Sequence, residues 1–295
     1  MISVLVIGVT GCTAGVNSDL GEYIITAQEA LEKVEAGALL VDAQNSAEAY
    51  QEKHLQGAVS ITRNMVMTSE PVVNSLIDLE TFEGVMEAAG IANDTEVIIY
   101  DNNKTMDSGR LFWTMVSYGH DNVKVVSGGL EALVAAGATV STEVPEVTPS
   151  SYTGTPLNTD HYASIDDVID QLNYPDPNTV ILDTRTPEEF EAGTIPTSIL
   201  IPFTENLYED GTMMPAQQIR IMYKKAGIEE DDTVIAYCKT SVRAAQTFVA
   251  LKSAGYENVK VYDGAYTEWE SDPALPIQLP EENEAPVISN EQDAS

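Results

Sequence analysis

Cys238 is the residue of this chain with the clearest potential for chemistry, because a thiolate is a strong nucleophile. It follows the short apolar run 234–237 and precedes an amphipathic stretch, 244–254, that has the pattern of a helix. The loop between them carries two cations, Lys239 and Arg243. Backbone N–H groups of such a loop, together with a helix N-terminus, form an anion site that favours the thiolate. Cys238 is therefore the predicted nucleophile, and its substrate is expected to be an anion.

A second candidate for the same site is Arg185, which lies just beyond the apolar run 179–183. Ligand sites in open α/β sheets gather at the carboxyl ends of parallel strands, so Arg185 can reach the pocket of the cysteine. The predicted substrate-binding residues are Arg185, Lys239, Thr240, Ser241, Val242 and Arg243.

Simpler roles stay open for the same residues. Arg185 could form a structural ion pair with Glu188 or Glu189, Lys239 could be a solvated loop residue, and Arg243 could pair locally. A cysteine after an apolar strand can also be a small buried hydrophobe.

The elements that must position these residues occur twice along the chain. Each half has short apolar runs and amphipathic helices in the same order: runs 38–42 and 179–183, 58–61 and 198–201, 96–100 and 233–237, 123–129 and 259–264, with helices at 110–118 and 244–254. Strands that alternate with helices predict a parallel sheet, and apolar strands without polar alternation predict that helices cover both faces. The predicted fold class is α/β, with two tandem domains, each a parallel sheet flanked by helices.

These motifs resemble the rhodanese family over residues 24 to 277. The first half carries His54-Leu55-Gln56-Gly57-Ala58, and the second carries Leu182-Asp183-Thr184-Arg185 and Val261-Tyr262-Asp263-Gly264. The loop from Cys238 to Ala244 is similar to the catalytic loop of the family. One segment departs, because 193–198 lacks the usual His and Gly-Ala pair. The resemblance implies two rhodanese-like domains, of which the first is catalytically silent, with Asp101 at the position of the cysteine.

The resemblance also implies a reaction. Cys238 would take the sulfane sulfur of thiosulfate as a persulfide and pass it to cyanide or a thiol, without a metal or organic cofactor. Arg185 would help to bind the anionic donor. Two alternatives stay open: 3-mercaptopyruvate as the donor, and a persulfide carrier without turnover of its own. The related cysteine phosphatases need five residues between cysteine and arginine, whereas Arg243 leaves four.

Composition limits the partners of this 295-residue chain. It has 47 acidic residues against 14 basic ones and a net charge of -33, which repels nucleic acids and anionic lipid headgroups. The three histidines, His54, His120 and His161, do not have the spacing of metal ligands. We expect His54 and Asp101 to be structural residues. The expected partners are a small anionic sulfur donor and a thiol or cyanide acceptor, and the expected state is a monomer.

The N-terminus predicts a membrane anchor. The apolar run 2–9 ends in Val9-Thr10-Gly11-Cys12, which resembles a bacterial lipobox whose cysteine is lipidated, although no basic region precedes it. The alternative is a first β-strand of a cytoplasmic protein. The predicted organisation is therefore a lipoprotein signal and tether (1–22), a silent domain (23–142), a linker (143–157), a catalytic domain (158–280) and an acidic tail (281–295), with an extracytoplasmic, lipid-anchored location.

Overall fold

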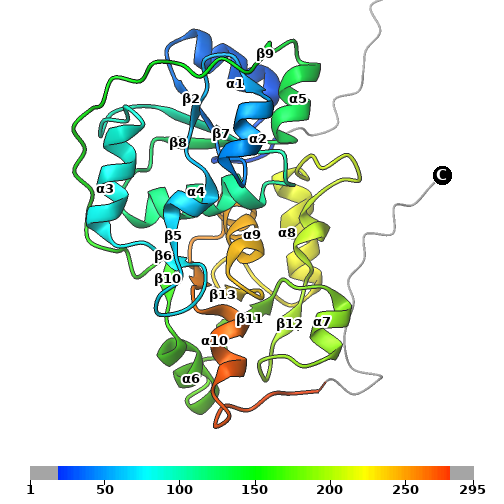
Figure 1. The fold of residues 1–295 in the computed structure, drawn as a ribbon. Coiled ribbons are helices and arrows are strands. Elements are labelled where there is room, and N and C mark those ends of the chain that lie inside the picture. Colours follow the sequence, from blue (N-terminus) through cyan, green and yellow to red (C-terminus); the bar gives the residue numbers. More distant parts are fainter. Residues whose placement is uncertain (1–18, 280–295) are drawn as a thin grey trace, which may run out of the picture.

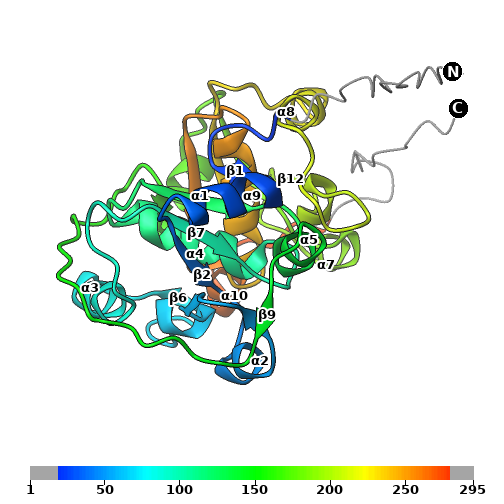
Figure 2. The same ribbon diagram turned by 90° about the horizontal axis from the view of Figure 1, so that it is seen from above.

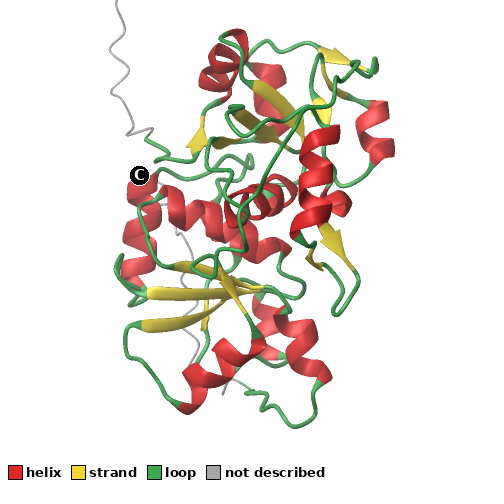
Figure 3. Ribbon diagram, turned by 90° about the vertical axis from the view of Figure 1, so that its left-hand side faces the viewer, coloured by secondary structure: helices red, strands yellow, loops and turns green. Residues whose placement is uncertain are grey.

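The computed structural model describes residues 19–279, which form two α/β domains that lie one above the other (Figure 1). Each domain is built on a five-stranded parallel sheet, and the two sheets have the same strand order. Helices cover both faces of each sheet (Figure 3). The predicted fold class of two tandem parallel α/β domains is therefore confirmed.

The strands of the two sheets correspond one to one. Across the N-terminal sheet they are β1 (Ile24–Ile25), β8 (Val123–Val126), β7 (Val97–Tyr100), β2 (Leu39–Asp42) and β4 (Val59–Ser60). Across the C-terminal sheet they are β10 (Tyr162–Ala163), β14 (Val259–Tyr262), β13 (Thr233–Tyr237), β11 (Thr179–Asp183) and β12 (Ile199–Leu200). Two small antiparallel pairs join β3 (His54–Leu55) to β9 (Val140–Ser141) and β5 (Met67–Thr68) to β6 (Ser75–Leu76).

The helices follow the strands in alternation. In the N-terminal domain they are α1 (Ala27–Glu35), α2 (Ala47–Glu52), η1 (Arg63–Val66), α3 (Leu79–Ala88), α4 (Met106–Ser117) and α5 (Gly129–Ala135). In the C-terminal domain they are α6 (Ile165–Asn173), α7 (Pro187–Glu191), η2 (Phe203–Asn206), α8 (Ala216–Lys225), α9 (Val242–Ser253) and α10 (Ala265–Ser271).

The central strand of each sheet is buried on both faces. Successive side chains of a strand point to opposite faces, so Val97 and Ile99 of β7 face the centre of the molecule, whereas Ile98 packs in the outer core of the N-terminal domain. In β13, Val234 faces the centre in the same way. This two-sided burial explains why these strands read as apolar runs rather than alternating ones.

The inner faces of the two sheets belong to one continuous core. Helix α4 and helix α9 cross at the middle of the molecule (Figure 1), and inner apolar side chains of both domains form a single cluster around them. The crossing is close at Gly109, because a Cβ at that position would lie 2.9 Å from Cα of Gln246. The two domains are therefore packed through the helices that follow their central strands.

Each domain also places a loop on the other. The N–H of Leu76, in the β5–β6 pair, donates to Asp263 Oδ2 of the C-terminal domain at 2.7 Å. The N–H of Met213 donates to Ser127 Oγ of the N-terminal domain at 2.8 Å. Since Asp263 and Ser127 are the residues directly after β14 and β8, the two contacts are reciprocal.

The linker between the two domains and the residues just before the first domain both pack against the domains. The predicted linker runs past α3 without helix or strand of its own and is hydrogen-bonded to it, for example from Ser150 N–H to Glu87 O at 3.1 Å (Figure 2). Residues 19–22, the end of the predicted tether, bind the C-terminal domain, where Ser253 Oγ donates to Leu20 O at 2.7 Å. Cys12, the rest of the tether and the predicted acidic tail lie outside the described residues. Within residues 19–279 no helix has both the length and the apolar composition needed to cross a bilayer.

Candidate active site

Cys238 is the first residue of the four-residue connection between β13 and α9, and it is buried, with an exposed fraction of 1%. The carbonyl of Cys238 accepts the N–H of Tyr266 at 2.9 Å. The carbonyl of Lys239 accepts the N–H and the Oγ1 hydroxyl of Thr267, at 3.1 and 2.6 Å. Because Tyr266 and Thr267 are in α10, this helix fixes the position of the cysteine loop.

The loop turns into α9 through Ser241, whose φ of 62° lies in the left-handed region. The helix begins at Val242, two residues before the start predicted from the sequence. The N–H groups of Arg243 and Ala244, in the first turn of α9, find no oxygen acceptor among the residues that the structure describes. Such free donors carry the positive end of the helix dipole.

The N-terminal domain shows what the same geometry binds. Asp101 follows its central strand, and Thr105 precedes α4 with a φ of 63°, so Asp101 corresponds to Cys238 and Thr105 to Ser241. Asp101 Oδ2 accepts the N–H groups of Asp107 and Ser108 at 3.0 and 2.8 Å, and these residues correspond to Arg243 and Ala244. The start of α4 therefore holds an anion, and that anion is the domain's own carboxylate.

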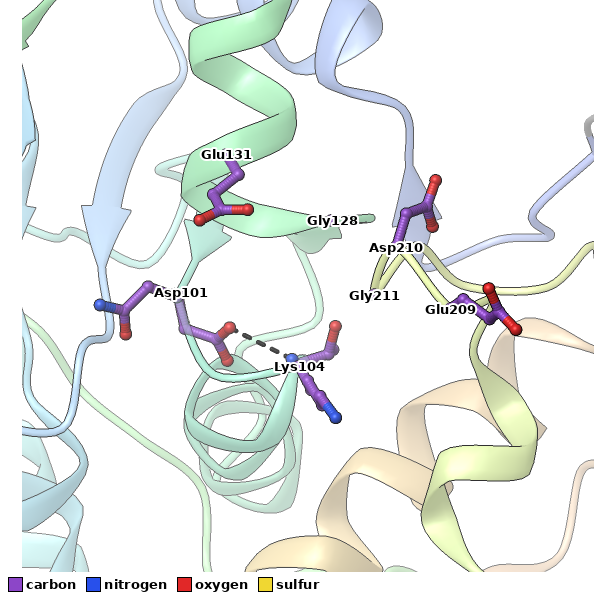
Figure 4. Close-up of a pocket in the computed structure, with 9 residues that line it drawn as sticks. Asp101, Lys104, Gly128, Glu131, Glu209, Asp210 and Gly211 are labelled. Atoms are coloured by element: carbon purple, nitrogen blue, oxygen red, sulfur yellow. Dashed lines mark hydrogen bonds between the residues drawn. The ribbon is translucent and has the colours of Figure 1, made fainter.

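Three further donors complete the cradle of Asp101. Oδ1 accepts the N–H groups of Asn103 and Thr105 at 2.9 and 3.1 Å, and Oδ2 accepts the hydroxyl of Ser108 at 2.9 Å. This confirms Asp101 as a loop and helix-capping residue. The carboxylate lies at the edge of a pocket of about 200 Å³ that is also lined by Lys104, Glu131 and the segment 209–211 of the C-terminal domain (Figure 4).

His54 is structural as well, since its ring nitrogens contact the carbonyls of Tyr50 and Glu143 at 2.7 and 3.0 Å.

Arg243 is close to the cysteine and is paired. Its guanidinium binds both carboxylate oxygens of Glu189, at 2.5 and 2.8 Å. Burial lowers the pKa of Arg243, but its hydrogen bonds to Glu189 and the charge of Cys238 outweigh burial and raise it overall. The same hydrogen bonds hold the pKa of Glu189 at about 2. Arg243 thus stays charged beside Cys238, with its orientation set by Glu189.

Of the other two predicted cations, Lys239 is exposed and Arg185 is buried. Lys239 is 42% exposed and forms an ion pair with Glu270 of α10. Arg185 is buried against its own strand: Nε and Nη2 bind the carboxylate of Asp183, and Nη2 also donates to Gly193 O at 2.7 Å. Within residues 19–279 Arg185 contacts Asp183, Gly193 and the ring of Tyr266 but not Cys238, so its role in substrate binding stays a prediction. The same holds for Thr240, Ser241 and Val242, which shape the loop.

Sequence reasoning missed one residue of this site, Arg110 of the N-terminal domain. Its Nη1 donates to Ser241 Oγ at 2.7 Å and to Asp263 Oδ1 at 3.1 Å, across the domain boundary. The signal that could have drawn attention to it is a lone arginine at the head of the run Leu111-Phe112-Trp113, on a helix that the pattern assigns to a core.

Comparison with known proteins agrees with this architecture. Residues 26–136 and 164–272 each match the model of the rhodanese-like domain. The chain therefore belongs to the rhodanese family. It is 29% identical, over 84% of its length and 93% of the relative, to a protein of Saccharopolyspora erythraea named "Putative thiosulfate sulfurtransferase". It is 31% identical, over 86% of its length and 95% of the relative, to the sulfur carrier protein TtuD of Thermus thermophilus.

Among solved structures, the fold is similar to that of an anaerobic ergothioneine biosynthesis enzyme from Chlorobium limicola. The TM-score is 0.78, with 20% identity, and the match covers 88% of this chain and 70% of that one. At this identity the likeness supports the fold alone.

Proposed function

We propose that this chain is a sulfurtransferase that moves the sulfane sulfur of thiosulfate to cyanide or a thiol through a persulfide on Cys238. The observation that carries the proposal is the correspondence of the two loops. The start of α4 binds an anion supplied by Asp101, whereas the equivalent donors at the start of α9 have no carboxylate and follow Cys238 instead. The relative of Saccharopolyspora erythraea carries the name of such an enzyme.

The reaction has two displacement steps. The thiolate of Cys238 attacks the outer sulfur of thiosulfate, the sulfur–sulfur bond of the donor breaks, and sulfite leaves with the bonding electron pair. Cyanide or a thiolate then attacks the outer sulfur of the persulfide, and the Cys238 thiolate leaves. Each step has an anionic nucleophile and an anionic leaving group, so preorganised donors stabilise the charge throughout.

The described residues have distinct tasks in this scheme. The first-turn N–H groups of α9 and the guanidinium of Arg243 lie where negative charge develops, and Glu189 keeps Arg243 in place. Thr267 and Tyr266 hold the loop carbonyls, so the loop does not have to reorganise during transfer.

The test is a comparison of two donors and two variants. Thiocyanate formation is measured from thiosulfate and from 3-mercaptopyruvate, with cyanide as acceptor, for the wild type and Cys238→Ser. We expect faster turnover with thiosulfate, and loss of turnover with both donors in Cys238→Ser at unchanged circular dichroism. Faster turnover with mercaptopyruvate reassigns the donor, and a Cys238→Ser variant that keeps its activity defeats the proposal.

A sulfur carrier is the second candidate, because the relative from Thermus thermophilus is named as one. A carrier must present its persulfide to a protein partner, whereas the side chain of Cys238 is 1% exposed. This burial favours a small acceptor. Mass spectrometry separates the two functions: a carrier accumulates the Cys238 persulfide with thiosulfate and does not release it to free cyanide or a small thiol.

A further inference from the structure

Arg110 is a fully buried cation that reaches from one domain into the other. It lies in the second turn of α4, and its guanidinium stacks on Trp113 of the same helix, 4.5 Å from the ring centre. Nη2 donates to the carbonyl of Asn74 at 2.9 Å. Nη1 crosses to the C-terminal domain and binds Ser241 Oγ and Asp263 Oδ1, while Nε has no hydrogen-bond partner.

The residues that Arg110 binds hold the cysteine loop in shape. Ser241 is the left-handed residue between Cys238 and α9, and its hydroxyl donates in turn to Thr240 O at 2.7 Å. Asp263, at the end of β14, accepts the N–H of Leu76 from the other domain. Arg110 therefore ties three pieces of backbone together at the loop that carries the nucleophile.

The position of this arginine is set by the helix crossing. Its neighbour Gly109 is so close to Gln246 that no side chain fits there. This contact leaves α4 little freedom to shift along α9. The guanidinium of Arg110 consequently enters the loop from a fixed direction.

The position in α9 that corresponds to Arg110 of α4 carries no charge. Arg110 lies five residues after Thr105, and the residue five positions after Ser241 is Gln246. Gln246 is neutral and binds Asn206 of its own domain at 3.1 Å. Where the cysteine site has Asp263, the Asp101 site has the neutral Ser127. The reciprocal position thus lacks both charges.

The hydrogen bond to Ser241 brings the guanidinium of Arg110 to the loop of Cys238, where the two charges interact. Burial lowers the pKa of Arg110, while Asp263 and Cys238 raise it and Arg63 lowers it further. From the other elements around the loop, Arg243 faces Cys238 with Glu189 as its partner, and Lys239 is paired with Glu270.

We propose that Arg110 is a positioning residue of the Cys238 site: the domain without a nucleophile supplies a buried guanidinium that fixes Ser241 and adds a positive charge beside the thiolate. This role rests on the proposed function of Cys238, but it acts on the thiolate itself. It can therefore be measured without any sulfur donor.

The experiment follows the alkylation of Cys238 by iodoacetamide as a function of pH in Cys12→Ala protein, so that Cys238 is the single thiol. An opposite charge close to an ionising group typically shifts its titration by about 1 to 3 units. For Arg110→Gln we expect the midpoint of the rate profile to rise by about one pH unit. The matched control is Arg220→Gln, because Arg220 binds Ala254 O at the far end of α9. Its midpoint should equal that of the parent protein.

A second variant keeps the proposal testable if Arg110→Gln does not fold. Asp263→Asn keeps one of the two acceptor oxygens that bind Arg110 and Leu76, replaces the other with an NH2 donor, and removes the negative charge that offsets the arginine. We expect its midpoint to fall by several tenths of a pH unit, and the double variant to lie between the two single ones. A folded Arg110→Gln or Asp263→Asn protein with the parent midpoint overturns the proposal. Absence of thiocyanate formation by the wild type would instead overturn the proposed function and leave this result standing.

Discussion

Asp101 and Cys238 occupy the same place in the two domains, directly after the central strand and ahead of a residue with left-handed backbone. In one domain the anion at this place is permanent, because it is a carboxylate that accepts four N–H groups and one hydroxyl. In the other, a thiol stands at this place, and the first-turn N–H groups of Arg243 and Ala244 in α9 have no oxygen acceptor among the described residues. The same local fold thus holds a structural carboxylate in one domain and, under the function that we propose, the nucleophile in the other.

The first prediction concerns the stability of the N-terminal domain. Asp101→Ala leaves the buried N–H groups of its cradle without an acceptor, so the free energy of unfolding should fall by at least about 2 kcal/mol. Asp101→Asn keeps part of the hydrogen bonding and should lose less. Urea unfolding monitored by circular dichroism measures both. Equal stability of Asp101→Ala and the wild type would contradict the structural role.

The second prediction concerns Arg185. Its ion pair with Asp183 is buried, and removal of one partner of such a pair typically costs about 3 to 5 kcal/mol. We expect Arg185→Ala to unfold more easily and, in the folded fraction, to raise KM for thiosulfate, because the predicted role of Arg185 is to bind the anionic donor. Kinetics below the unfolding temperature check this. An unchanged KM in fully folded protein would leave Arg185 with its structural ion pair alone.

The third prediction concerns Lys239, which is half-exposed and paired with Glu270. Exposed ion pairs contribute about 0.2 to 1 kcal/mol, so Lys239→Gln should lower kcat/KM by less than about fivefold. The loss should be larger with thiosulfate, a dianion, than with mercaptopyruvate. The two rates are compared at matched ionic strength, because salt screens this attraction. Equal losses with both donors would refute a role of Lys239 in choosing the donor.

The fourth prediction is a pH dependence. Hydrogen bonds from Arg243 hold the pKa of Glu189 at about 2, below its usual value of 4.5. A carboxyl group with a lowered pKa in the folded state stabilises the protein above its ordinary pKa, and this stability is lost as the pH falls through the folded value. Glu189→Gln should therefore be less stable than the wild type at pH 7, and the gap should close between about pH 4.5 and 2.

The control for this pH dependence is the neighbouring variant Glu188→Gln. Glu188 is exposed in the first turn of α7 and has no guanidinium partner among the described residues. Its stability should follow the wild type closely across the same range. Urea titrations at several pH values measure all three proteins, and a constant gap for Glu189→Gln down to pH 2 would exclude the ion pair as its cause.

The fifth prediction concerns Cys12, which lies outside the described residues. We propose that it is lipidated, because the lipobox-like tetrapeptide follows a short apolar run. Cell fractionation should find the wild-type protein with membranes and Cys12→Ala in the soluble fraction. A wild-type protein found wholly in the cytosol would refute the anchor.

The sequence was sufficient for the parts of the fold that depend on local pattern. The run 233–237 is β13 to the residue, and the run 96–100 becomes β7 one residue shorter. Strands that are buried on both faces are recognisable because nearly all of their side chains are apolar. The two-residue strands β1 and β10 were not predicted, since two residues carry no periodicity.

The candidate site was predictable only within its own loop. Cys238, Lys239 and Arg243 are neighbours in the chain, so their proximity could be predicted. The contact of Arg110 with Ser241 joins residues 131 positions apart and depends on how two helices cross. Likewise, Glu189 pairs with Arg243 and not with Arg185. Which of the two arginines it binds depends on the direction in which the side chains point. Spacing in one sequence does not contain this information.

The reciprocal contacts between the domains have the arrangement of a two-fold homodimer, although both halves belong to one chain. Helix α4 meets α9, and each half lays a loop on the strand end of the other, as an isologous two-fold interface requires of identical subunits. The two halves differ at these matched places: one has the thiol of Cys238, and the other donates Arg110 to the loop that carries it. Under the role that we propose for Arg110, the half with Asp101 acts as the second subunit of a shared site.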